Sequence, residues 1–389
     1  MENFVTKNKI LLFVFAEAIL LSGFVLTMAW LWDRWLIPGP HGSIRWIGMD
    51  FVPYWVGVRA MLNGQSPYNP GTTQTIQSIL LGGPPEIGGD PMMFVYPAWI
   101  FLLLVPWALL PLRWAVALWT GLLLFGALHL IGFLAIRWGA TRPRATAFWA
   151  LVLTVGGLPF LVISASKGQL GLVSLGALML VNRLWKRHEM AAGIVLGLAT
   201  LKPTLTVIPT LGFLLWAVME RKYRLLVGFA ACMGILFLSS WLAVGNWIPD
   251  YLKLISNTGG APILWSLAIL PWPWKALYTL FFAGLVVYAF IILRRTRNQP
   301  QWFSATVLAG LALFPMRWIY DLLLGILVPA EARDLRGGLA ISVVIALVVP
   351  WGLTLFQPSL RWSAYVVGLP LAWAIVWLVQ FIYARRKRR

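Results

Sequence analysis

The sequence predicts an all-α polytopic membrane protein with about twelve transmembrane helices. Three observations lead to this fold class. Hydrophobic residues make up 60% of the 389 residues and charged residues only 11%. Long apolar runs recur along the chain, and short basic clusters separate them. Such a composition excludes an ordinary soluble domain and leaves no room for a large separate one.

The net charge of +19 would by itself suggest a nucleic-acid-binding protein. The basic residues alternate with apolar runs, however, which is typical of an inner membrane face that meets anionic lipid. We therefore expect membrane lipids as partners and no nucleic acid. The single cysteine, Cys232, excludes an intrachain disulfide. The N-terminal apolar run is long and lacks a cleavage site, so we expect an uncleaved first span.

The apolar runs place the elements in chain order. The first span is expected at 10–31, and a polar loop broken by Gly and Pro follows at 33–93. The run at 96–111 has about 16 residues, fewer than the roughly 20 that a span needs, and predicts a second interfacial or re-entrant helix. The other spans are expected at 113–136, 146–164, 168–183, 190–202, 204–219, 224–244, 275–293, 302–314, 318–330, 338–356 and 362–383.

We expect the whole chain, 1–389, to form a single membrane-embedded domain. Its parts would be a first external loop with interfacial helices at 33–112, further catalytic spans at 113–330, and C-terminal spans with a basic tail at 331–389. One set of connections, with the two termini, holds 21 of the 31 lysines and arginines. The positive-inside rule then places both termini in the cytoplasm and the first loop outside a plasma or inner membrane.

The stretch 48–68 is where we expect a site to be organised. Apolar residues recur at three- to four-residue spacing after Phe51, with Pro53 in the first turn and Gly64 at the end. This pattern predicts a short helix with one apolar face, which would lie in the membrane interface. Asp50 would sit at its amino end, facing water. The alternative is that Asp50 only caps the helix.

Two runs, 190–202 and 204–219, are too short to cross a membrane alone. They join at Leu201-Lys202-Pro203 and predict a broken hairpin with Lys202 near its tip. A lysine within the membrane is costly and usually functional. The alternative is a side chain that snorkels to the outer interface.

The residues that could carry chemistry include no metal signature, because the three histidines lie far apart and the cysteine has no partner. There is also no phosphate-binding glycine loop and no nucleophile elbow. Asp50, Lys167-Gly168-Gln169, Lys202-Pro203 and Arg317-Trp318 all fall at predicted outer ends of spans. They could converge on one cavity.

One carboxylate with several cations suits the transfer of a sugar from a lipid phosphate. This reaction needs a base for the acceptor hydroxyl and positive charge for the departing phosphate. Phosphate leaves readily, so the paired carboxylates of a glycosidase are unnecessary.

Several polar residues keep simpler alternatives. Lys167 and Arg317 can simply mark outer helix ends, and Arg317 can pair with Asp321 one helical turn later. Glu17, inside the first span, can be protonated, face a hydroxyl on a neighbouring helix or line a lipid groove. His129 is expected to be a hydrogen-bonded packing residue.

These positions also resemble glycosyltransferase family 87 of the GT-C superfamily of integral-membrane glycosyltransferases, the polyprenyl-phosphate-mannose-type transferases. In chain order, the matching fragments are Asp50-Phe51-x-x-Tyr54, Asn63-Gly64-x-x-Pro67-Tyr68, Tyr96-Pro97, Gly168-Gln169, Gly197-Leu198-Ala199-Thr200-Leu201-Lys202-Pro203 and Pro315-x-x-Trp318. The resemblance implies a GT-C fold with an outward-facing site, in which Asp50 corresponds to the catalytic aspartate. The family often has a histidine two residues after the late tryptophan, where this chain has Tyr320.

Together these features predict a polyprenyl-phosphate-sugar-dependent hexosyltransferase that moves mannose or a similar hexose or pentose to a lipid or glycan acceptor. Asp50 is expected to be the general base, and no metal or cofactor is expected. The residues expected at the donor phosphate or lipid are Lys202, Arg317, Lys167, Gln169 and Tyr320. Those expected at the substrate are Tyr54, Arg59, Tyr96, Trp318 and Asp90.

Two other classes of protein remain as alternatives. A transporter or flippase of lipid-linked sugars would share the spans and the broken hairpin, but it would show internal repeats with paired broken helices, and only one such hairpin is seen. A non-catalytic membrane scaffold would not need an intramembrane lysine.

Overall fold

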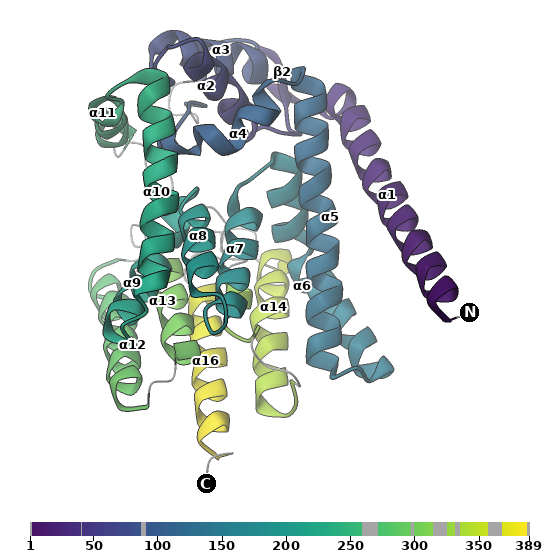
Figure 1. The fold of residues 1–389 in the computed structure, drawn as a ribbon, viewed down its shortest axis with the longest axis vertical. Coiled ribbons are helices and arrows are strands. Elements are labelled where there is room, and N and C mark those ends of the chain that lie inside the picture. Colours follow the sequence, from purple (N-terminus) through teal and green to yellow (C-terminus); the bar gives the residue numbers. More distant parts are fainter. Residues whose placement is uncertain are drawn as a thin grey trace. The chain divides into compact units, whose positions relative to one another are not determined.

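The computed structural model confirms a predominantly α-helical protein (Figure 1). It describes residues 2–39, 41–86, 91–258, 271–296, 299–313, 325–330, 335–356 and 368–386. The elements up to the first long loop's end are α1 (Glu2–Arg34), β1 (Leu36–Gly39), β2 (Gly42–Arg45), α2 (Val52–Leu62), α3 (Pro70–Leu81), the 3₁₀ turn η1 (Ala98–Ile100) and α4 (Phe101–Ala108). The later helices are α5 (Leu112–Gly139), α6 (Pro143–Lys167), α7 (Gly171–Leu184), α8 (Glu189–Ala199), α9 (Pro203–Met219), α10 (Tyr223–Val244), α11 (Ile248–Thr258), α12 (Trp274–Thr296), α13 (Gln299–Leu313), α14 (Gly338–Phe356) and α16 (Leu369–Arg386).

Within the described residues, three helices are long and apolar enough to cross a membrane: Leu12–Arg34 of α1, α5 and α10. α6 makes a fourth if its two bent halves are taken as one span. These helices lie where the apolar runs predicted spans, and they make the chain a membrane protein. The expected total of twelve stays a prediction, since most of the run at 318–330 and the start of the run at 362–383 lie outside the described residues.

The first loop contains more structure than expected. The run at 96–111 forms only η1 and α4, an apolar stretch too short to cross, as predicted. The antiparallel hairpin of β1 and β2, which pairs Leu36 with Arg45, was not predicted. Nor was α3, which begins where the Asn69 side chain accepts a hydrogen bond from the Thr72 amide (2.7 Å) and ends at Gly82, with φ of +76°.

The chain divides into two compact units. The first consists of Met1–His129, Val162–Gln169 and Leu236–Gly260. The second consists of Leu130–Leu161, Leu170–Ile235 and Ala261–Arg389. The expectation of one membrane-embedded domain stays a prediction.

In the first unit, α2 packs against α3 and α4. Most of its residues are buried, and only Trp55, Arg59 and Leu62 retain appreciable exposure. Gly57 faces the Phe94 ring so closely that a Cβ there would collide with it. α2 is therefore enclosed by the loop, in contrast to the expected helix with one face in the interface. The sequence pattern showed an apolar face but not the segments that cover the rest of the helix.

In the second unit, the predicted broken hairpin is present. α8 ends at Ala199 and α9 begins at Pro203, so Lys202 stands at the break. The Ala199 carbonyl accepts hydrogen bonds from the hydroxyls of Thr206 (2.9 Å) and Ser174 (3.3 Å). These contacts satisfy a carbonyl that the interrupted helix leaves without its usual partner.

Helices α1 and α5 meet along an antiparallel seam within the first unit (Figure 1). At its centre Gly121 lies against Val25, and a Cβ at Gly121 would be 3.1 Å from the Val25 Cα. Asp33 pairs with Arg113 at 2.8 Å on one side, and Glu17 lies 3.1 Å from His129 on the other. The three contacts are equally spaced along both helices: positions 33, 25 and 17 of α1 meet positions 113, 121 and 129 of α5. Glycine permits the close crossing, and longer polar side chains bridge the helices on either side.

The Glu17–His129 contact resolves what the sequence left open for both residues. His129 is hydrogen-bonded as predicted, since its Nδ1 lies 2.9 Å from the Phe125 carbonyl. Its side chain is 45% exposed, however, so it is not a packed core residue. Glu17 contacts this imidazole. None of the three interpretations of Glu17 drawn from the sequence had included a histidine partner. Ionisable groups within a membrane usually occur in such pairs.

Candidate active site

Asp50 lies in the turn before α2. The N-cap residue of α2 is Phe51, which makes no side-chain capping hydrogen bond. Asp50 thus stands one residue before the assigned N-cap, and both interpretations of its role stay predictions. Asp50 is partly exposed. Its main chain is held by a hydrogen bond from its own amide to the Lys167 carbonyl (2.9 Å).

Two turns distant in sequence are joined by main-chain hydrogen bonds in the first unit. The Gly48 amide donates to the Ser166 carbonyl (2.7 Å), and the Asp50 amide donates to the Lys167 carbonyl (2.9 Å). Gly48 has φ of +69°, and a Cβ there would be 2.5 Å from the Val116 side chain. Both the conformation and the space favour glycine at this point. The turn that carries Asp50 is thus fastened to the carboxyl end of α6.

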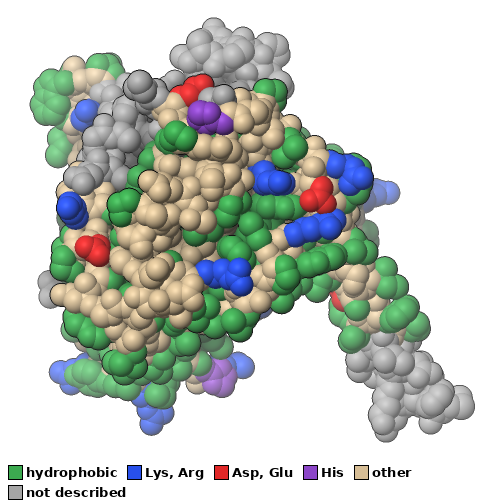
Figure 2. Space-filling view, turned by 90° about the horizontal axis from the view of Figure 1, so that it is seen from above, with side chains coloured by type: hydrophobic (Ala, Val, Ile, Leu, Met, Phe, Trp, Pro, Cys, Tyr) green, Lys and Arg blue, Asp and Glu red, His purple; other side chains and the backbone are tan. Residues whose placement is uncertain are grey.

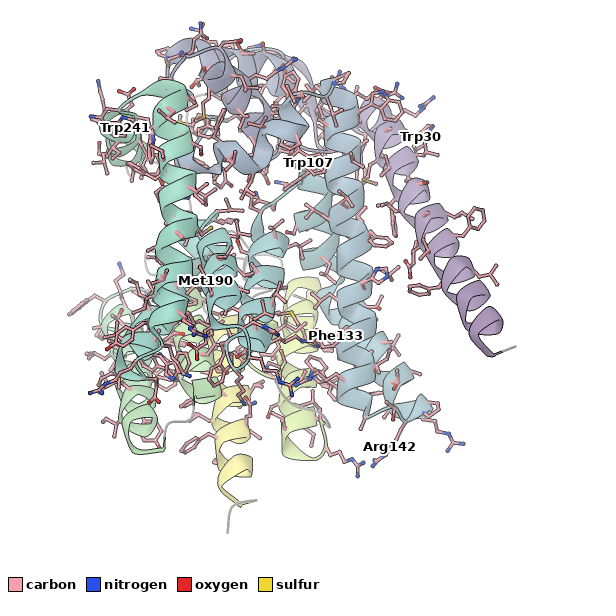
Figure 3. The ribbon with its side chains drawn as sticks, viewed as in Figure 1. Trp30, Trp107, Phe133, Arg142, Met190 and Trp241 are labelled. Atoms are coloured by element: carbon pink, nitrogen blue, oxygen red, sulfur yellow. The ribbon has the colours of Figure 1, made fainter. Side chains whose placement is uncertain are left out.

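Trp119 of α5 contacts both turns at once. Its indole Nε1 donates a 2.8 Å hydrogen bond to the Gly168 carbonyl, and its ring stacks on Phe51 with centroids 5.4 Å apart. Trp107, labelled in Figure 3, meets the Trp119 ring edge-on at 5.2 Å. Gly168 has φ of +81°, and a Cβ there would be 2.6 Å from the Phe51 Cβ. Trp119 is therefore a positioning residue for this junction.

Sequence reasoning missed Trp119. The chain has 24 tryptophans. Those in apolar runs look alike in the sequence, so nothing in residue type or spacing distinguishes Trp119 from the others. Trp119 lies about two turns into the span predicted at 113–136, near the span end where the turns of Asp50 and Lys167 were also predicted, and this position is the signal that could have found it. Tryptophan N–H groups generally find a partner when buried.

Lys167 and Gln169 flank Gly168 in the second of the two turns. The Lys167 ammonium lies 4.5 Å from the centre of the Trp46 ring, a cation–π contact. Lys167 is also the last residue of α6, so the simpler interpretation, that it marks a helix end, holds as well. Gln169 is buried, and its main-chain N–H donates to the Ser164 carbonyl (2.8 Å). The structure thus brings Lys167 and Gln169 to the turn of Asp50.

The aromatic candidates form the adjoining wall of the first unit. Tyr54 is fully buried, and its ring meets that of Tyr96 edge-on at 4.5 Å. The Tyr68 hydroxyl donates a 2.7 Å hydrogen bond to the Tyr96 carbonyl. Burial, followed by the nearby Tyr251, raises the pKa of Tyr68 far above its ordinary value, so this donor keeps its proton. Arg59 is exposed, with its guanidinium 4.3 Å above the Trp55 ring.

Lys202 belongs to the second unit. It precedes Pro203 as the N-cap residue of α9, and its carbonyl accepts the amides of Leu205 (3.0 Å) and Thr206 (3.2 Å). Its side chain is only 3% exposed. A lysine that snorkels towards water would be expected to expose its ammonium.

The remaining sequence candidates, Asp90, Arg317, Trp318 and Tyr320, lie outside the described residues, as does Asp321. Within the described part of the chain, no group of three or more His, Cys, Asp or Glu side chains could hold a metal ion. The first unit therefore brings six candidates into one compact body. They are Asp50, Tyr54, Arg59, Tyr96, Lys167 and Gln169.

Comparison with known proteins gives one finding. The sequence model of glycosyltransferase family 87 matches residues 94–316, more than half of the chain. The matched range includes Tyr96, Trp119, Lys167, Gln169 and Lys202, and it begins after Asp50. Neither a curated protein nor a solved structure matches the sequence.

Proposed function

From its membership of glycosyltransferase family 87, to which the chain belongs, we propose that this membrane glycosyltransferase uses a polyprenyl-phosphate-linked sugar as donor. It transfers mannose or a similar hexose or pentose to a hydroxyl of a lipid or glycan acceptor. The reaction takes place at the outer face of a plasma or inner membrane, with both termini in the cytoplasm. The distribution of basic clusters supports this orientation.

The junction of the two turns is the observation that carries this proposal. It holds a partly exposed carboxylate, Asp50, next to the turn of a lysine, Lys167, through the 2.9 Å main-chain hydrogen bond between them. A base and a cation are the two groups that sugar transfer from a lipid phosphate requires. The main-chain hydrogen bond keeps the two residues close to each other, whatever their side chains contact.

The proposed reaction is a single displacement at the anomeric carbon. The Asp50 carboxylate takes the proton of the acceptor hydroxyl, and the acceptor oxygen forms a bond to that carbon. The bond from the carbon to the donor phosphate oxygen breaks, and its electron pair leaves with the polyprenyl phosphate. Nearby ammonium or guanidinium groups stabilise the charge that develops on this phosphate.

Lys202 is the proposed contact for the donor phosphate. Its burial and its place at the positive amino end of α9 both favour an anionic ligand there. Arg317, Lys167, Gln169 and Tyr320 complete the proposed donor-phosphate and lipid contacts. The proposed substrate contacts are Arg59, Tyr96, Trp318 and Asp90. Tyr54 is fully buried, and its ring packs against that of Tyr96 and so helps to position it.

Release of polyprenyl phosphate is the direct test. Purified protein is incubated with a panel of polyprenyl-phosphate sugars and candidate acceptors, and the freed polyprenyl phosphate is measured. Asp50→Asn serves as the inactive control. Release that depends on Asp50 with at least one donor supports the proposal, and no release with any donor of the panel contradicts it.

The competing function is transport of lipid-linked sugars, which the break between α8 and α9 with its buried lysine would also suit. A transporter moves the intact lipid across a liposome membrane without releasing polyprenyl phosphate. Measuring transfer across the bilayer and release in the same liposomes distinguishes the two functions.

A further inference from the structure

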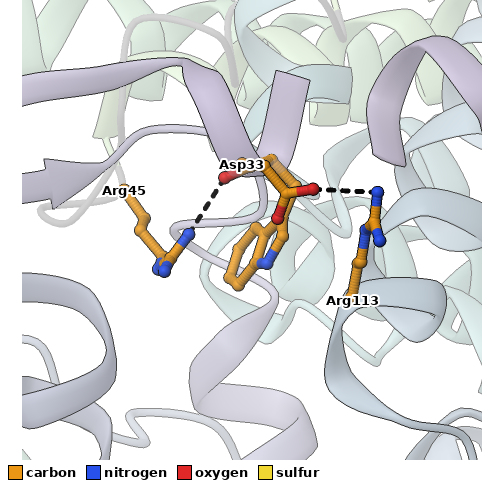
Figure 4. Close-up of polar contacts among 4 residues, drawn as sticks. Asp33, Arg45 and Arg113 are labelled. Atoms are coloured by element: carbon orange, nitrogen blue, oxygen red, sulfur yellow. Dashed lines mark hydrogen bonds and ion pairs between the residues drawn. The ribbon is translucent and has the colours of Figure 1, made fainter. Parts of the chain in front are cut away.

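Three arginines and one carboxylate belong to the region where α1 ends. Arg113 pairs with Asp33 at 2.8 Å, and the Arg45 guanidinium donates a 3.0 Å hydrogen bond to the Trp32 carbonyl (Figure 4). Arg34 is the last residue of α1. The Asp33 and Arg113 side chains are 42% and 47% exposed, so their ion pair contributes little to stability. The Asp33–Arg113 ion pair alone therefore does not explain why three arginines occur in this region.

Each of these arginines lies over a tryptophan ring. The guanidinium carbons of Arg34, Arg45 and Arg113 are 4.9, 4.8 and 5.5 Å from the ring centres of Trp30, Trp32 and Trp114 respectively. Stacking uses the flat face of a guanidinium and leaves its in-plane N–H groups able to donate. The cluster thus offers several donors around a net positive charge. Figure 2 shows basic and acidic side chains together on this face.

The exposed surface of α1 leads directly to the cluster. Ile19, Leu26 and Trp30 are 58%, 61% and 52% exposed, and their spacing places them on one side of the helix. Arg34 continues this stripe one turn beyond Trp30, which Figure 3 shows on α1. Leu26 and Arg34 are separated by roughly 12 Å along the helix axis. The stripe therefore passes from aliphatic groups to an indole and then to a cation.

We propose that this stripe binds a glycerophospholipid of the surrounding membrane with an anionic headgroup. The acyl chain lies along Ile19 and Leu26, the indole of Trp30 lies at the level of the glycerol, and the phosphate accepts hydrogen bonds from Arg34. Tryptophan is common at this level of a bilayer, and a long arginine side chain near a helix end can reach the interface. Three guanidinium groups against one carboxylate favour anionic over zwitterionic headgroups.

Lipid titration followed by native mass spectrometry tests this proposal. Purified protein is titrated separately with phosphatidylglycerol, phosphatidylcholine and polyprenyl phosphate. Phosphatidylglycerol should bind more tightly than phosphatidylcholine. Arg34→Gln should weaken phosphatidylglycerol binding about fivefold, as expected for one basic residue at a membrane surface. Arg34→Lys should restore part of this affinity, because it keeps the charge but not the planar fork.

Lys253→Gln is the matched control, since it removes one exposed positive charge from α11 of the same unit. It should leave phosphatidylglycerol binding unchanged. Equal weakening in Lys253→Gln and Arg34→Gln would overturn the proposal, as would equal affinity for phosphatidylglycerol and phosphatidylcholine. If Arg34→Gln weakens only polyprenyl phosphate binding, the cluster serves the donor and the phospholipid proposal is wrong.

Discussion

The main-chain amide of Asp50 donates a 2.9 Å hydrogen bond to the carbonyl oxygen of Lys167. This bond joins the turn before α2 to the carboxyl end of α6, although the two segments are far apart in the chain. Because the contact uses backbone atoms only, either side chain can be changed without removing it. The proposed base can therefore be tested with the site geometry retained.

Replacing Asp50 by Asn should abolish sugar transfer while leaving the fold intact. The amide keeps the size of the side chain but cannot take the acceptor proton, so we expect turnover to fall on the order of a hundredfold or more. Initial rates of polyprenyl phosphate release, together with an unchanged thermal melting curve, provide the measurement. Turnover close to that of the original protein would mean that Asp50 is not the base.

Trp119→Phe should lower turnover with little change in KM. The change keeps an aromatic ring against Phe51 but removes the 2.8 Å hydrogen bond to the Gly168 carbonyl. Loss of one such bond costs about 1 kcal/mol. We expect turnover to fall about tenfold, because the two turns lose a shared support. Steady-state kinetics over a range of donor concentrations measure both parameters.

Trp302→Phe is the matched control for this prediction. Trp302 is also buried, and its indole donates a 2.8 Å hydrogen bond to a glycine carbonyl, that of Gly212, in the second unit. The two variants should lose similar stability, but only Trp119→Phe should lose turnover. Similar kinetic losses in both would show that Trp119 acts through general stability alone.

Gly168→Ala should destabilise the protein more than Gly64→Ala. Both glycines have positive φ, +81° and +69°, where a residue with a Cβ is strained by about 1–2 kcal/mol. A Cβ at Gly168 would additionally lie 2.6 Å from the Phe51 Cβ, whereas at Gly64 nothing lies within 4 Å. Thermal melting in detergent measures the difference. Equal losses would indicate that Phe51 moves aside without cost.

Glu17→Gln should be tolerated better than Glu17→Leu. His129 donates through Nδ1 to the Phe125 carbonyl (2.9 Å), so its Nε2 is the atom that faces Glu17, at 3.1 Å. Glutamine can donate to Nε2 and keep the contact. Leucine cannot, and we expect a loss of about 0.6–1.7 kcal/mol. Unfolding of the two variants in the same detergent compares them, and indistinguishable stabilities would mean that the contact contributes nothing.

Lys202→Gln should weaken donor binding and slow release of the phosphate, with little change in acceptor affinity. Lys202→Arg should rescue only part of the loss, because a planar fork does not replace a point charge in a fitted site. Donor affinity measured for both variants decides the matter. Unchanged affinity in Lys202→Gln would remove this residue from the donor site.

Sequence patterns were most informative where apolar runs are long. They located α1, α5 and α10, and the break at Lys202 followed from two runs that are each too short to span. The two turns that carry Asp50 and Lys167 were placed at the same ends of spans, and the structure joins them. Short elements were missed: the β1–β2 hairpin, α3 and α11 are each too short to cross a membrane and lie outside the apolar runs that predicted the spans.

The sequence alone could not predict which side chains of different helices contact each other. Glu17 and His129 were both noticed, but their contact depends on the register between α1 and α5, which Gly121 sets by allowing close approach to Val25. The burial of Tyr54 depends likewise on Tyr96, from a segment distant in the chain. A single sequence reports the apolar face of a helix but not the partner that covers it.

The α1–α5 seam also bears on the order of events during synthesis. α1 leaves the ribosome first, and α5 follows only after the whole segment 35–111 has been made. Glu17 therefore enters the bilayer before His129 exists, and an ionisable side chain without a partner is costly there. When α5 arrives, the His129 imidazole can meet Glu17 and the Val25–Gly121 crossing can close. A nascent chain that stops before His129 would leave an acid alone in its only span, a feature by which the cell could recognise the unfinished protein.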